Sequence, residues 1–371
     1  MLIYFIFFGI LFGAYMLFFK SGFVKKEQTS KLLFAIVFGL SFFLLLALRH
    51  PNMGVDLKDN PITGKVGYCT MFELIGQMSW KDVFTEQVGH YEQGYVIFNK
   101  IVSIFSKDRQ AIVVACALIN AICVSIFIYK NSEQSFFTTI IYLSLPSFFI
   151  LLSGVRQGIA IGITMLAFLC IKEKKWFGFI LLVLLASTIH TSSILFLVAY
   201  PLFYIKQTGI VKVISIAILP LVYIFRTPLF NLLSGILKDD AKAQENGALT
   251  LFLVFVLIYI FLLIIGNQEN KMVNGCINLF FTACICQAFG GIYTTAMRVG
   301  YYFMVYACIA IPNAIADEDG GAIKLNSRQK LTVKILLFAV FFAYLVYTLY
   351  INDGTDSIQW FETNPYRFFW E

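Results

Sequence analysis

Long, nearly uninterrupted runs of apolar residues constrain the fold of this chain more than any other feature. Two examples are "LTLFLVFVLIYIFLLIIG" from residue 249 and "ILLFAVFFAYLVYTLYI" from residue 335. As a helix, such a run can cross a hydrocarbon core of about 30 Å with its backbone hydrogen bonds satisfied internally. Only 13% of the residues are charged, against about a quarter in soluble domains. The sequence therefore predicts an all-α, polytopic integral membrane protein.

Hydropathy predicts about twelve transmembrane helices in one integral membrane domain, residues 1–371. The first run, "MLIYFIFFGILFGAYMLFF", has no basic segment before it and no cleavage site after it, so we interpret it as a retained span. Several spans are short, which leaves tilted, re-entrant or tightly turned pairs as alternatives. The spans are expected near residues 2–19, 32–48, 110–129, 135–152, 156–171, 176–189, 192–205, 210–225, 248–265, 275–290, 299–312 and 332–351.

Basic residues in the short loops predict the orientation in the membrane. If twelve spans alternate, these loops all fall on one side, which the positive-inside rule makes cytoplasmic. Both termini and the 49–109 segment then lie outside. That segment also holds seven basic residues, but long loops carry less weight in the rule. The loop residues are Lys20, Lys25, Lys26, Lys31, Lys130, Lys172, Lys174, Lys175, Lys206, Lys212, Lys271, Lys324, Arg328 and Lys330.

The predicted outer segment, residues 49–109, is too long and too patterned to be a simple connector. Aromatic and charged residues alternate in it with roughly helical spacing, and Ser79 followed by Asp82 indicates a helix start. We expect interfacial or re-entrant helices at the outer leaflet. Residues 226–247 are expected to form a second extracytoplasmic loop.

Several classes of site are not supported by the sequence. The net charge of +7 is spread over many loops without a basic cluster beside aromatic residues, so a nucleic-acid partner is not expected. The eight cysteines contain no C-x-x-C pair, and neither a disulfide framework nor a zinc site is predicted. The "DEDG" stretch from residue 317 is best explained as a solvated cytoplasmic loop. We predict no metal and no cofactor.

Polar residues gather at the ends of spans on the predicted outer side. The span interiors hold no Asp, Glu, Lys or Arg, whereas coupled transporters usually need an ionisable residue or a broken helix near the midplane. This distribution favours surface chemistry over transport. The outward residues are Arg49, Asp56, Glu92, Tyr95, Arg156, His190, Arg226 and Arg298.

Arginines at helix ends suit phosphate, because a guanidinium forms bidentate, charge-assisted bonds and can neutralise a pyrophosphate leaving group. Any one of them could instead be a snorkelling anchor, and we prefer that interpretation for Arg226. Arg156 in "SGVRQG" and Arg298 in "TTAMRVG" have small neighbours, and for these two a functional role is favoured. Glycines 154, 158 and 162 share one helix face and predict close helix packing that fixes where Arg156 points.

His190 in "ASTIHTSS" is the candidate base. The span before it returns through "KEKKW", which predicts that Arg156 and His190 meet at one membrane face. Imidazole can take a proton from an attacking sugar hydroxyl or contact phosphate as a cation. The alternative is a histidine simply bonded to a polar turn. Asp56 and Glu92 are rival bases, but carboxylates among arginines are better suited to positioning.

These residues occur in pieces that resemble one family. The pieces are "RHPNMGVD", "EQGY", "GVRQGIA", "ASTIHTSS" and "MRVGYYF", which contain Arg49 and Asp56, Glu92 and Tyr95, Arg156 and Gln157, His190, and Arg298 and Tyr301. In this order they resemble the EpsG-like, Wzy-type polysaccharide polymerases of bacterial surface glycan synthesis (O-antigen, exopolysaccharide or capsule). The chain departs from the family's aromatic pattern after Asp56, where it reads "LKDNPITG".

The resemblance implies a metal-independent glycosyltransferase in the bacterial cytoplasmic membrane, with its site facing the periplasm or cell exterior. It would transfer a glycan from undecaprenyl pyrophosphate to a lipid-linked oligosaccharide repeat unit. Arg156 and Arg298 would bind pyrophosphate with help from Arg49, and His190 would be the base or a phosphate contact. Asp56 and Glu92 would orient sugar or arginines. The remaining substrate contacts implied are Tyr95, Gln157 and Tyr301.

Membrane lipids, a chain-length regulator and a flippase are the expected partners on the same resemblance. Three other functions stay open at this stage. One is a ligase that uses the same donor with a different acceptor, another is a flippase or exporter of lipid-linked sugars, and the third is a noncatalytic scaffold.

Overall fold

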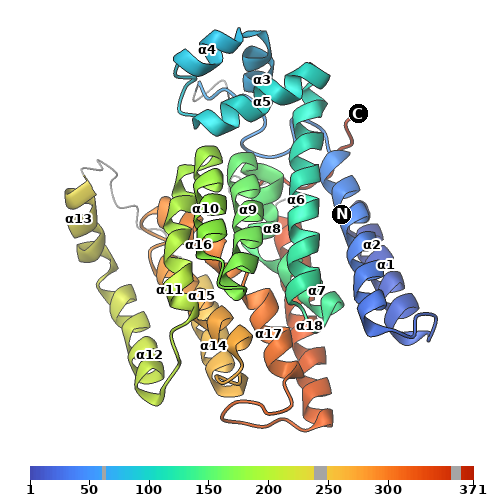
Figure 1. The fold of residues 1–371 in the computed structure, drawn as a ribbon, viewed down its shortest axis with the longest axis vertical. Helices are drawn as coiled ribbons and strands as arrows, with labels where there is room; N and C mark the ends of the chain where they lie inside the picture. The colour runs from blue at the N-terminus through green and yellow to red at the C-terminus, as the bar shows by residue number, and fades with distance from the viewer. Residues whose placement is uncertain (61–63, 238–248, 352–360) are drawn as a thin grey trace. The chain divides into compact units, whose positions relative to one another are not determined.

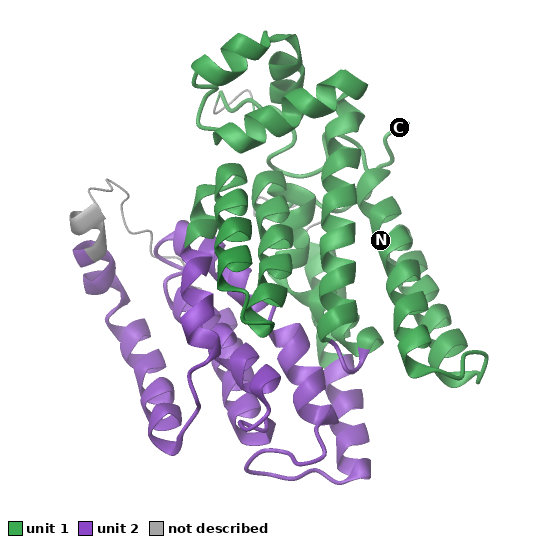
Figure 2. Ribbon diagram, viewed as in Figure 1, with its two compact units in different colours: residues 1–131, 135–194, 339–371 green, residues 132–134, 195–338 purple. Residues whose placement is uncertain are grey.

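The computed structural model describes residues 1–60, 64–237, 249–351 and 361–371. Throughout these ranges the fold is helical, and the β-pairing is confined to isolated bridges. The chain divides into two compact units, which are described separately (Figures 1 and 2). Unit 1 comprises Met1–Asn131, Ser135–Ile194 and Ala339–Glu371, and unit 2 comprises Ser132–Gln134 and Leu195–Phe338.

Unit 1 contains most of the predicted site residues. Its first helices, α1 and α2, pack on one another through buried phenylalanines, and α2 and α6 run side by side. The second half of α18 joins them, where Phe342 meets Phe8 edge to face. The helices of this unit are α1 Leu2–Tyr15, η1 Met16–Lys20, α2 Glu27–Ala47, α3 Tyr68–Gln77, α4 Trp80–Thr85, α5 Gln93–Phe105, α6 Arg109–Asn131, α7 Ser135–Ser144, α8 Pro146–Ser153, α9 Val155–Lys172 and α10 Trp176–Ile189.

The longer part of unit 2 begins within η2, which leads into the short helix α11. Its core is built on α15, which packs against α11, α14, α16 and α17. Two asparagines of α15, Asn274 and Asn278, donate to the Ile205 carbonyl at 2.7 Å, so they satisfy backbone where α11 has ended. The elements are η2 Thr191–Val198, α11 Ala199–Phe203, α12 Gly209–Ile224, α13 Arg226–Leu237, α14 Leu249–Ile265, α15 Lys271–Ala288, α16 Thr294–Met304, α17 Ala307–Ala316 and α18 Ser327–Ile351.

The helices confirm a membrane protein, but the prediction of twelve spans is not confirmed. Among the described residues, six helices are long and apolar enough to cross a membrane, or up to eight if each bent pair is one span. Three further apolar helices are shorter, including both members of the pair predicted to be tilted or re-entrant. The six are Leu2–Lys20, Glu27–Ala47, Arg109–Asn131, Val155–Lys172, Thr295–Ala316 and Ser327–Ile351.

Helix breaks account for two of the predicted spans that are not found as single long helices. The predicted span 135–152 is two helices, α7 and α8, bent by 65°. Pro146 stands at the first turn of α8, where its missing N–H costs nothing but ends the preceding helix. Helix α12 is likewise bent by 79° from Arg226–Leu232, within what was predicted as the loop 226–247. Residues 238–247 of that predicted loop lie outside the described residues.

Within the described part of segment 49–109 the predicted helices are present as α3, α4 and α5, and their place at the outer leaflet stays a prediction. Helix α4 begins with the predicted capping box, in which Ser79 accepts from the Asp82 amide and the Asp82 carboxylate accepts from Ser79. Helices α3 and α5 pack on each other and on α6, and α5 also packs on α10. Their shared core includes Phe72 and Ile75 of α3 with Val96 of α5, all fully buried. This packing places the start of α5 beside the first turn of α9 and the last turn of α10.

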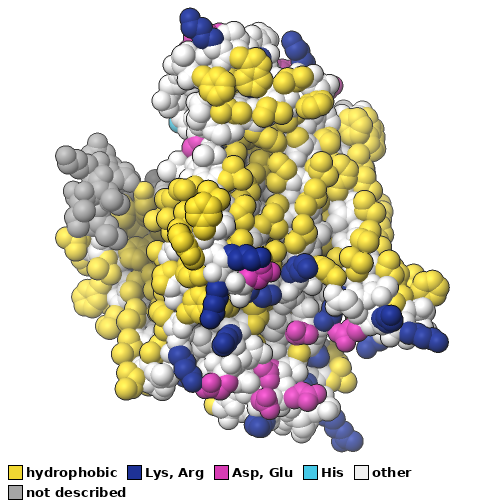
Figure 3. Space-filling view, viewed as in Figure 1, with side chains coloured by type: hydrophobic (Ala, Val, Ile, Leu, Met, Phe, Trp, Pro, Cys, Tyr) yellow, Lys and Arg dark blue, Asp and Glu magenta, His cyan; other side chains and the backbone are white. Residues whose placement is uncertain are grey.

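The outer surface of unit 1 is strongly apolar along its helices. Five large hydrophobic residues of α10 are 45–61% exposed: Trp176, Phe177, Leu181, Leu184 and Leu185. In Figure 3 charged side chains gather below this apolar surface, at the end where α9 and α10 are joined. Lys172, Lys174 and Lys175 belong to this junction. An apolar flank with a basic end is typical of a helix pair in a membrane.

Candidate functional site

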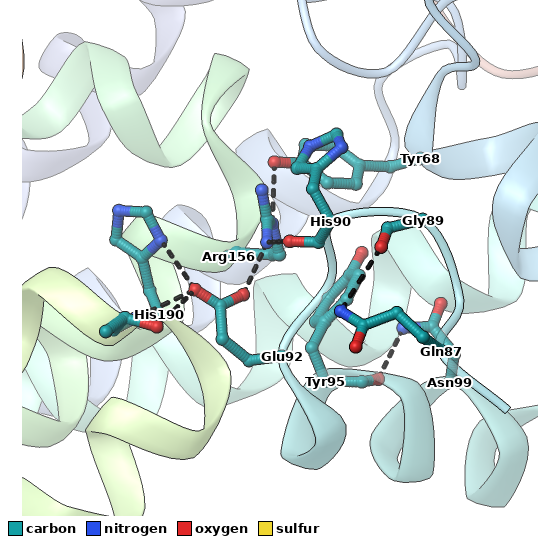
Figure 4. Close-up of polar contacts among 10 residues, drawn as sticks. Tyr68, Gln87, Gly89, His90, Glu92, Tyr95, Asn99, Arg156 and His190 are labelled. Atoms are coloured by element: carbon teal, nitrogen blue, oxygen red, sulfur yellow. Dashed lines mark hydrogen bonds and ion pairs between the residues drawn. The ribbon is translucent and has the colours of Figure 1, made fainter. Parts of the chain in front are cut away.

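Glu92 is the residue around which the predicted site residues of unit 1 gather. It is the N-cap residue of α5, but its side chain makes no cap hydrogen bond to its own helix. The carboxylate instead accepts from Thr191, from the backbone N–H at 2.8 Å and from the hydroxyl at 3.1 Å (Figure 4). One carboxylate thus ties the start of α5 to the end of α10.

The close approach of α5 to α10 depends on Gly94. A Cβ at this position would lie 2.3 Å from the Thr188 hydroxyl oxygen and 2.6 Å from the Thr188 carbonyl oxygen. Neither distance is tolerable for a carbon atom. The glycine of "EQGY" therefore serves the position of Glu92, two residues before it.

Arg156 lies in the first turn of α9 and is paired on several sides. Its Nη1 forms an ion pair with the Glu92 carboxylate and also donates to the His90 carbonyl at 3.3 Å. Its Nε donates to the Tyr68 hydroxyl at 3.0 Å. Nη2 takes part in none of these bonds. The side chain is 9% exposed, so these partners replace most of its solvent.

Three tyrosine rings surround the same guanidinium. Its central carbon lies 4.6 Å from the ring centre of Tyr91, 5.6 Å from that of Tyr68 and 6.0 Å from that of Tyr95. The electron-rich faces of aromatic rings attract cations at such distances, and each contact is worth roughly 0.5–2 kcal/mol depending on solvent. The predicted substrate contact Tyr95 is fully buried here, so it supports Arg156 in this structure.

His190 lies on the other side of the Glu92 carboxylate. It is the C-cap residue of α10, in extended conformation, and its Nδ1 lies 3.5 Å from Glu92 Oε1. Figure 4 shows the carboxylate between the imidazole and the guanidinium. Arg156 and His190 are therefore neighbours through Glu92, as the α9–α10 hairpin predicts. Their catalytic roles remain predictions.

The electrostatics of this cluster favour an ionised Glu92. Burial alone would raise its pKa, but the contacts from His190, the Thr191 amide and the Arg156 charge outweigh burial and lower it from its ordinary 4.5 to about 2. The positive field of donors and guanidinium therefore keeps the carboxylate charged at neutral pH. Such a carboxylate is a weak base and a good positioning group.

The glycine row of α9 packs closely on neighbouring helices, as predicted, with Gly158 on α8 and Gly162 on α6. A Cβ on Gly158 would lie 3.2 Å from Leu151 Cα, and one on Gly162 would lie 3.1 Å from Cys123 Cβ of α6. Close packing at these two glycines holds α9, which carries Arg156 in its first turn. Gln157, the neighbouring predicted contact, is 4% exposed.

Arg49 contacts other partners than the residues of the Glu92 cluster, and its predicted help in pyrophosphate binding stays a prediction. Its side chain is 1% exposed, and Nη1 donates to the carbonyls of Leu151 at 3.4 Å and Leu152 at 2.5 Å. These carbonyls belong to the last turn of α8, which has no helical partner for them. Gly54, with φ +113°, brings the same loop against Leu152. The motif "RHPNMGVD" thus caps a broken helix.

Asp56 also has a different partner from the one expected. It forms an ion pair with Lys65, and no arginine contact is found for it in the part of the chain that the structure describes. The two remaining predicted residues, Arg298 and Tyr301, belong to unit 2, on α16, where Tyr301 is 3% exposed. The guanidinium of Arg226 lies 4.2 Å from the ring centre of Tyr223.

No set of metal ligands occurs in the described residues. No group of three or more His, Cys, Asp or Glu side chains there is arranged to hold a metal ion. Asp317 of "DEDG" instead accepts from Asn270 at 2.9 Å, and this and neighbouring hydrogen bonds outweigh burial and lower its pKa. A loop carboxylate that accepts hydrogen bonds from asparagine fits the interpretation of this stretch as a loop and not as a metal site.

Sequence reasoning missed the aromatic and hydroxyl partners of the site. Tyr68 and Tyr91 enclose Arg156, and Thr191 anchors Glu92. The signal for Tyr91 was present as the tyrosines of "HYEQGY" on both sides of Glu92. Tyr68 could not be found this way, because it reaches Arg156 from a helix 88 residues earlier.

The EpsG family matches the chain over residues 31–368. The match includes every residue of the Glu92 cluster. No curated protein and no solved structure matches the chain.

Proposed function

Because the chain belongs to the EpsG family, a family of polysaccharide polymerase-like membrane proteins, we propose that it polymerises a surface glycan from lipid-linked repeat units. The donor is a growing glycan on undecaprenyl pyrophosphate, and the acceptor is the terminal sugar of a new lipid-linked repeat unit. The site faces the periplasm or cell exterior from the cytoplasmic membrane. The observation that carries the proposal is the Glu92 carboxylate held between Arg156 and His190.

In this mechanism His190 is the general base. The Glu92 carboxylate lies 3.5 Å from Nδ1 of the imidazole. In this position it would orient the ring and stabilise the imidazolium that forms. Nε2 takes the proton of the acceptor hydroxyl as that oxygen attacks the anomeric carbon of the donor. The bond from the anomeric carbon to the pyrophosphate oxygen breaks, and the pyrophosphate carrier leaves with the electron pair.

Arg156 has two tasks in this proposal. Its Nη1 neutralises Glu92 and its Nε is held by Tyr68, so the guanidinium is rigid before substrate arrives. Nη2 is the group we assign to the leaving pyrophosphate. A preorganised cation stabilises the charge that develops on the leaving group. Arg298 is the second pyrophosphate contact that we propose, on the sequence resemblance alone.

The alternatives are separated by their products. Purified protein in detergent is supplied with lipid-linked repeat units, and carrier release and product length are measured. A polymerase gives a ladder of lengthening glycans and releases carrier, and Arg156→Ala abolishes both. Transfer of a single glycan to a different acceptor would indicate a ligase. Absence of carrier release in detergent, with transport activity in vesicles, would indicate an exporter. Full polymer output in cells from Arg156→Ala, His190→Ala and Arg298→Ala alike, each at normal protein levels, would indicate a noncatalytic scaffold.

A further inference from the structure

A groove runs between α2 and α6 of unit 1, away from the Glu92 cluster. Its volume is about 460 Å³, and it is lined by α2 from Leu32 to Phe43 and by α6 from Leu118 to Tyr129. Both helices are among the candidate membrane spans. Over Leu32 to Phe43 the groove extends about 16 Å at 1.5 Å per helical residue. That is about half of a 30 Å hydrocarbon core, the depth of one leaflet.

The walls of this α2–α6 groove are apolar and its floor is small. Leu32, Ile36 and Leu40 of α2 are 44–61% exposed along one wall. Leu118, Ile122 and Ile126 of α6 are 36–49% exposed along the other. On the floor, a Cβ on Gly39 would lie 2.7 Å from the Ser125 hydroxyl oxygen. The groove therefore keeps its depth here because residue 39 has no side chain. A linear hydrocarbon chain fits such a channel.

One end of the groove is basic. The Lys130 ammonium lies 5.6 Å from the ring centre of Tyr129, which lines the groove. Lys172 of α9 donates to the Lys130 carbonyl at 3.1 Å and to Asn131 Oδ1 at 2.7 Å, so its ammonium is already held at the end of α6. Lys31 is paired with Glu27 at 2.9 Å and adds no net charge. An anion at this end of the groove would meet the Lys130 ammonium.

We propose that the α2–α6 groove is a binding site for an anionic phospholipid, with one acyl chain along the groove and the phosphate at Lys130. The groove is assigned to a phospholipid and not to the polyprenyl donor because its basic end lies at Lys130. The tail of the donor would have its pyrophosphate near Arg156, at the other end of α9, about 24 Å from Lys172 at 1.5 Å per residue. A lipid with its charge at the Lys130 end fits the groove directly.

The test uses the full-length purified protein and native mass spectrometry after exchange into mixed phosphatidylglycerol and phosphatidylcholine. Wild-type protein is expected to retain phosphatidylglycerol in preference to phosphatidylcholine. Lys130→Gln should lower that preference about fivefold, the effect of one basic residue near a membrane surface. Ser125→Phe fills the groove and should reduce retention of both lipids. Lys174→Gln, in the same basic loop region but outside the groove, is the matched control.

Each other result overturns the proposal. Equal retention of the two lipids by wild type, or unchanged retention in both Lys130→Gln and Ser125→Phe, would contradict an anionic lipid site. Displacement of phosphatidylglycerol by undecaprenyl phosphate at equal concentration would assign the groove to the carrier instead. Loss of a dimer in Ser125→Phe would assign it to a second copy of the chain. Melting temperatures of all variants establish that each is folded.

Discussion

Glu92 shows how much one side chain can organise. Its two oxygens serve a guanidinium from α9, an amide and a hydroxyl from Thr191, and an imidazole at the end of α10. The ionised carboxylate strengthens each bond that it accepts, and hydrogen bonds to charged groups are worth about 1.5–3 kcal/mol each. The cluster is therefore a joint between helices as well as a candidate site. Its stability and its chemistry can be separated by substitution.

The first prediction concerns pH and Glu92. Its pKa is lowered from 4.5 to about 2 by folding, so the folded protein holds this proton less tightly than the unfolded chain. The resulting stability is present above pH 4.5 and is lost as the pH falls toward 2. Its full size is on the order of 3 kcal/mol. Thermal unfolding between pH 7 and pH 3 should show this decline in wild type and a flatter profile in Glu92→Gln. Parallel profiles for the two proteins would count against the ionised joint.

The second prediction separates a hydroxyl from a ring. Tyr68→Phe removes the acceptor of Arg156 Nε and leaves a buried donor unpaired, which costs about 1–3 kcal/mol. Tyr91→Phe keeps its ring over the guanidinium and loses only a 3.5 Å contact with the Val66 carbonyl, so it is the matched control. Unfolding temperature should fall in the first variant and stay near wild type in the second. Equal losses would contradict the assigned Nε bond.

At the scale of elements, the site depends on how closely helices approach. Gly94 brings α5 onto α10, and Gly162 brings α9 onto α6. The sequence predicts the glycine row of α9 because its four-residue spacing is a local pattern. The sequence does not predict the break between α7 and α8, because the residues on both sides of Pro146 are apolar and give one continuous hydropathy peak. The capping role of Arg49 follows from that break and is equally invisible.

The third prediction tests the α5–α10 approach. Gly94→Ala places a carbon against Thr188 and should cost about 1–3 kcal/mol of stability, with a larger loss of activity because Glu92 is displaced. Gly9→Ala is the same change in α1, where nothing lies within 4 Å, and should be neutral or slightly stabilising. Unfolding temperature and carrier release are measured for both. Activity in Gly94→Ala equal to that in Gly9→Ala would rule out this role of the glycine.

At the scale of the molecule, composition alone predicts an all-helical membrane protein, and the apolar helices bear this out. The number of spans is harder to predict, because short apolar helices such as α10 satisfy a hydropathy window without the length to cross alone. The ordered motifs identify the family correctly over residues 31–368. The motif pieces that contain Glu92, Arg156 and His190 all lie within that range.

The fourth prediction concerns sidedness. In unit 1, α9 runs from the Glu92 cluster to the basic loop at Lys174, about 25 Å along its axis. We expect Gln87→Cys to react with a membrane-impermeant maleimide in intact cells, and Lys174→Cys to react only after permeabilisation. The wild-type chain, with its eight native cysteines, is labelled in parallel as the blank. The reverse pattern would place the candidate site on the cytoplasmic side.

The most direct measurement of the central claim compares two histidines in the same assay. His190 contacts the Glu92 carboxylate. The backbone N–H of His50 instead donates to the Arg367 carbonyl at 2.8 Å. Carrier release by purified His190→Ala, relative to His50→Ala, is measured with lipid-linked repeat units. The account predicts a loss of roughly 10²–10⁴-fold for His190→Ala, the usual contribution of a general base, and near-normal turnover for His50→Ala. Equal turnover in the two folded variants would contradict it.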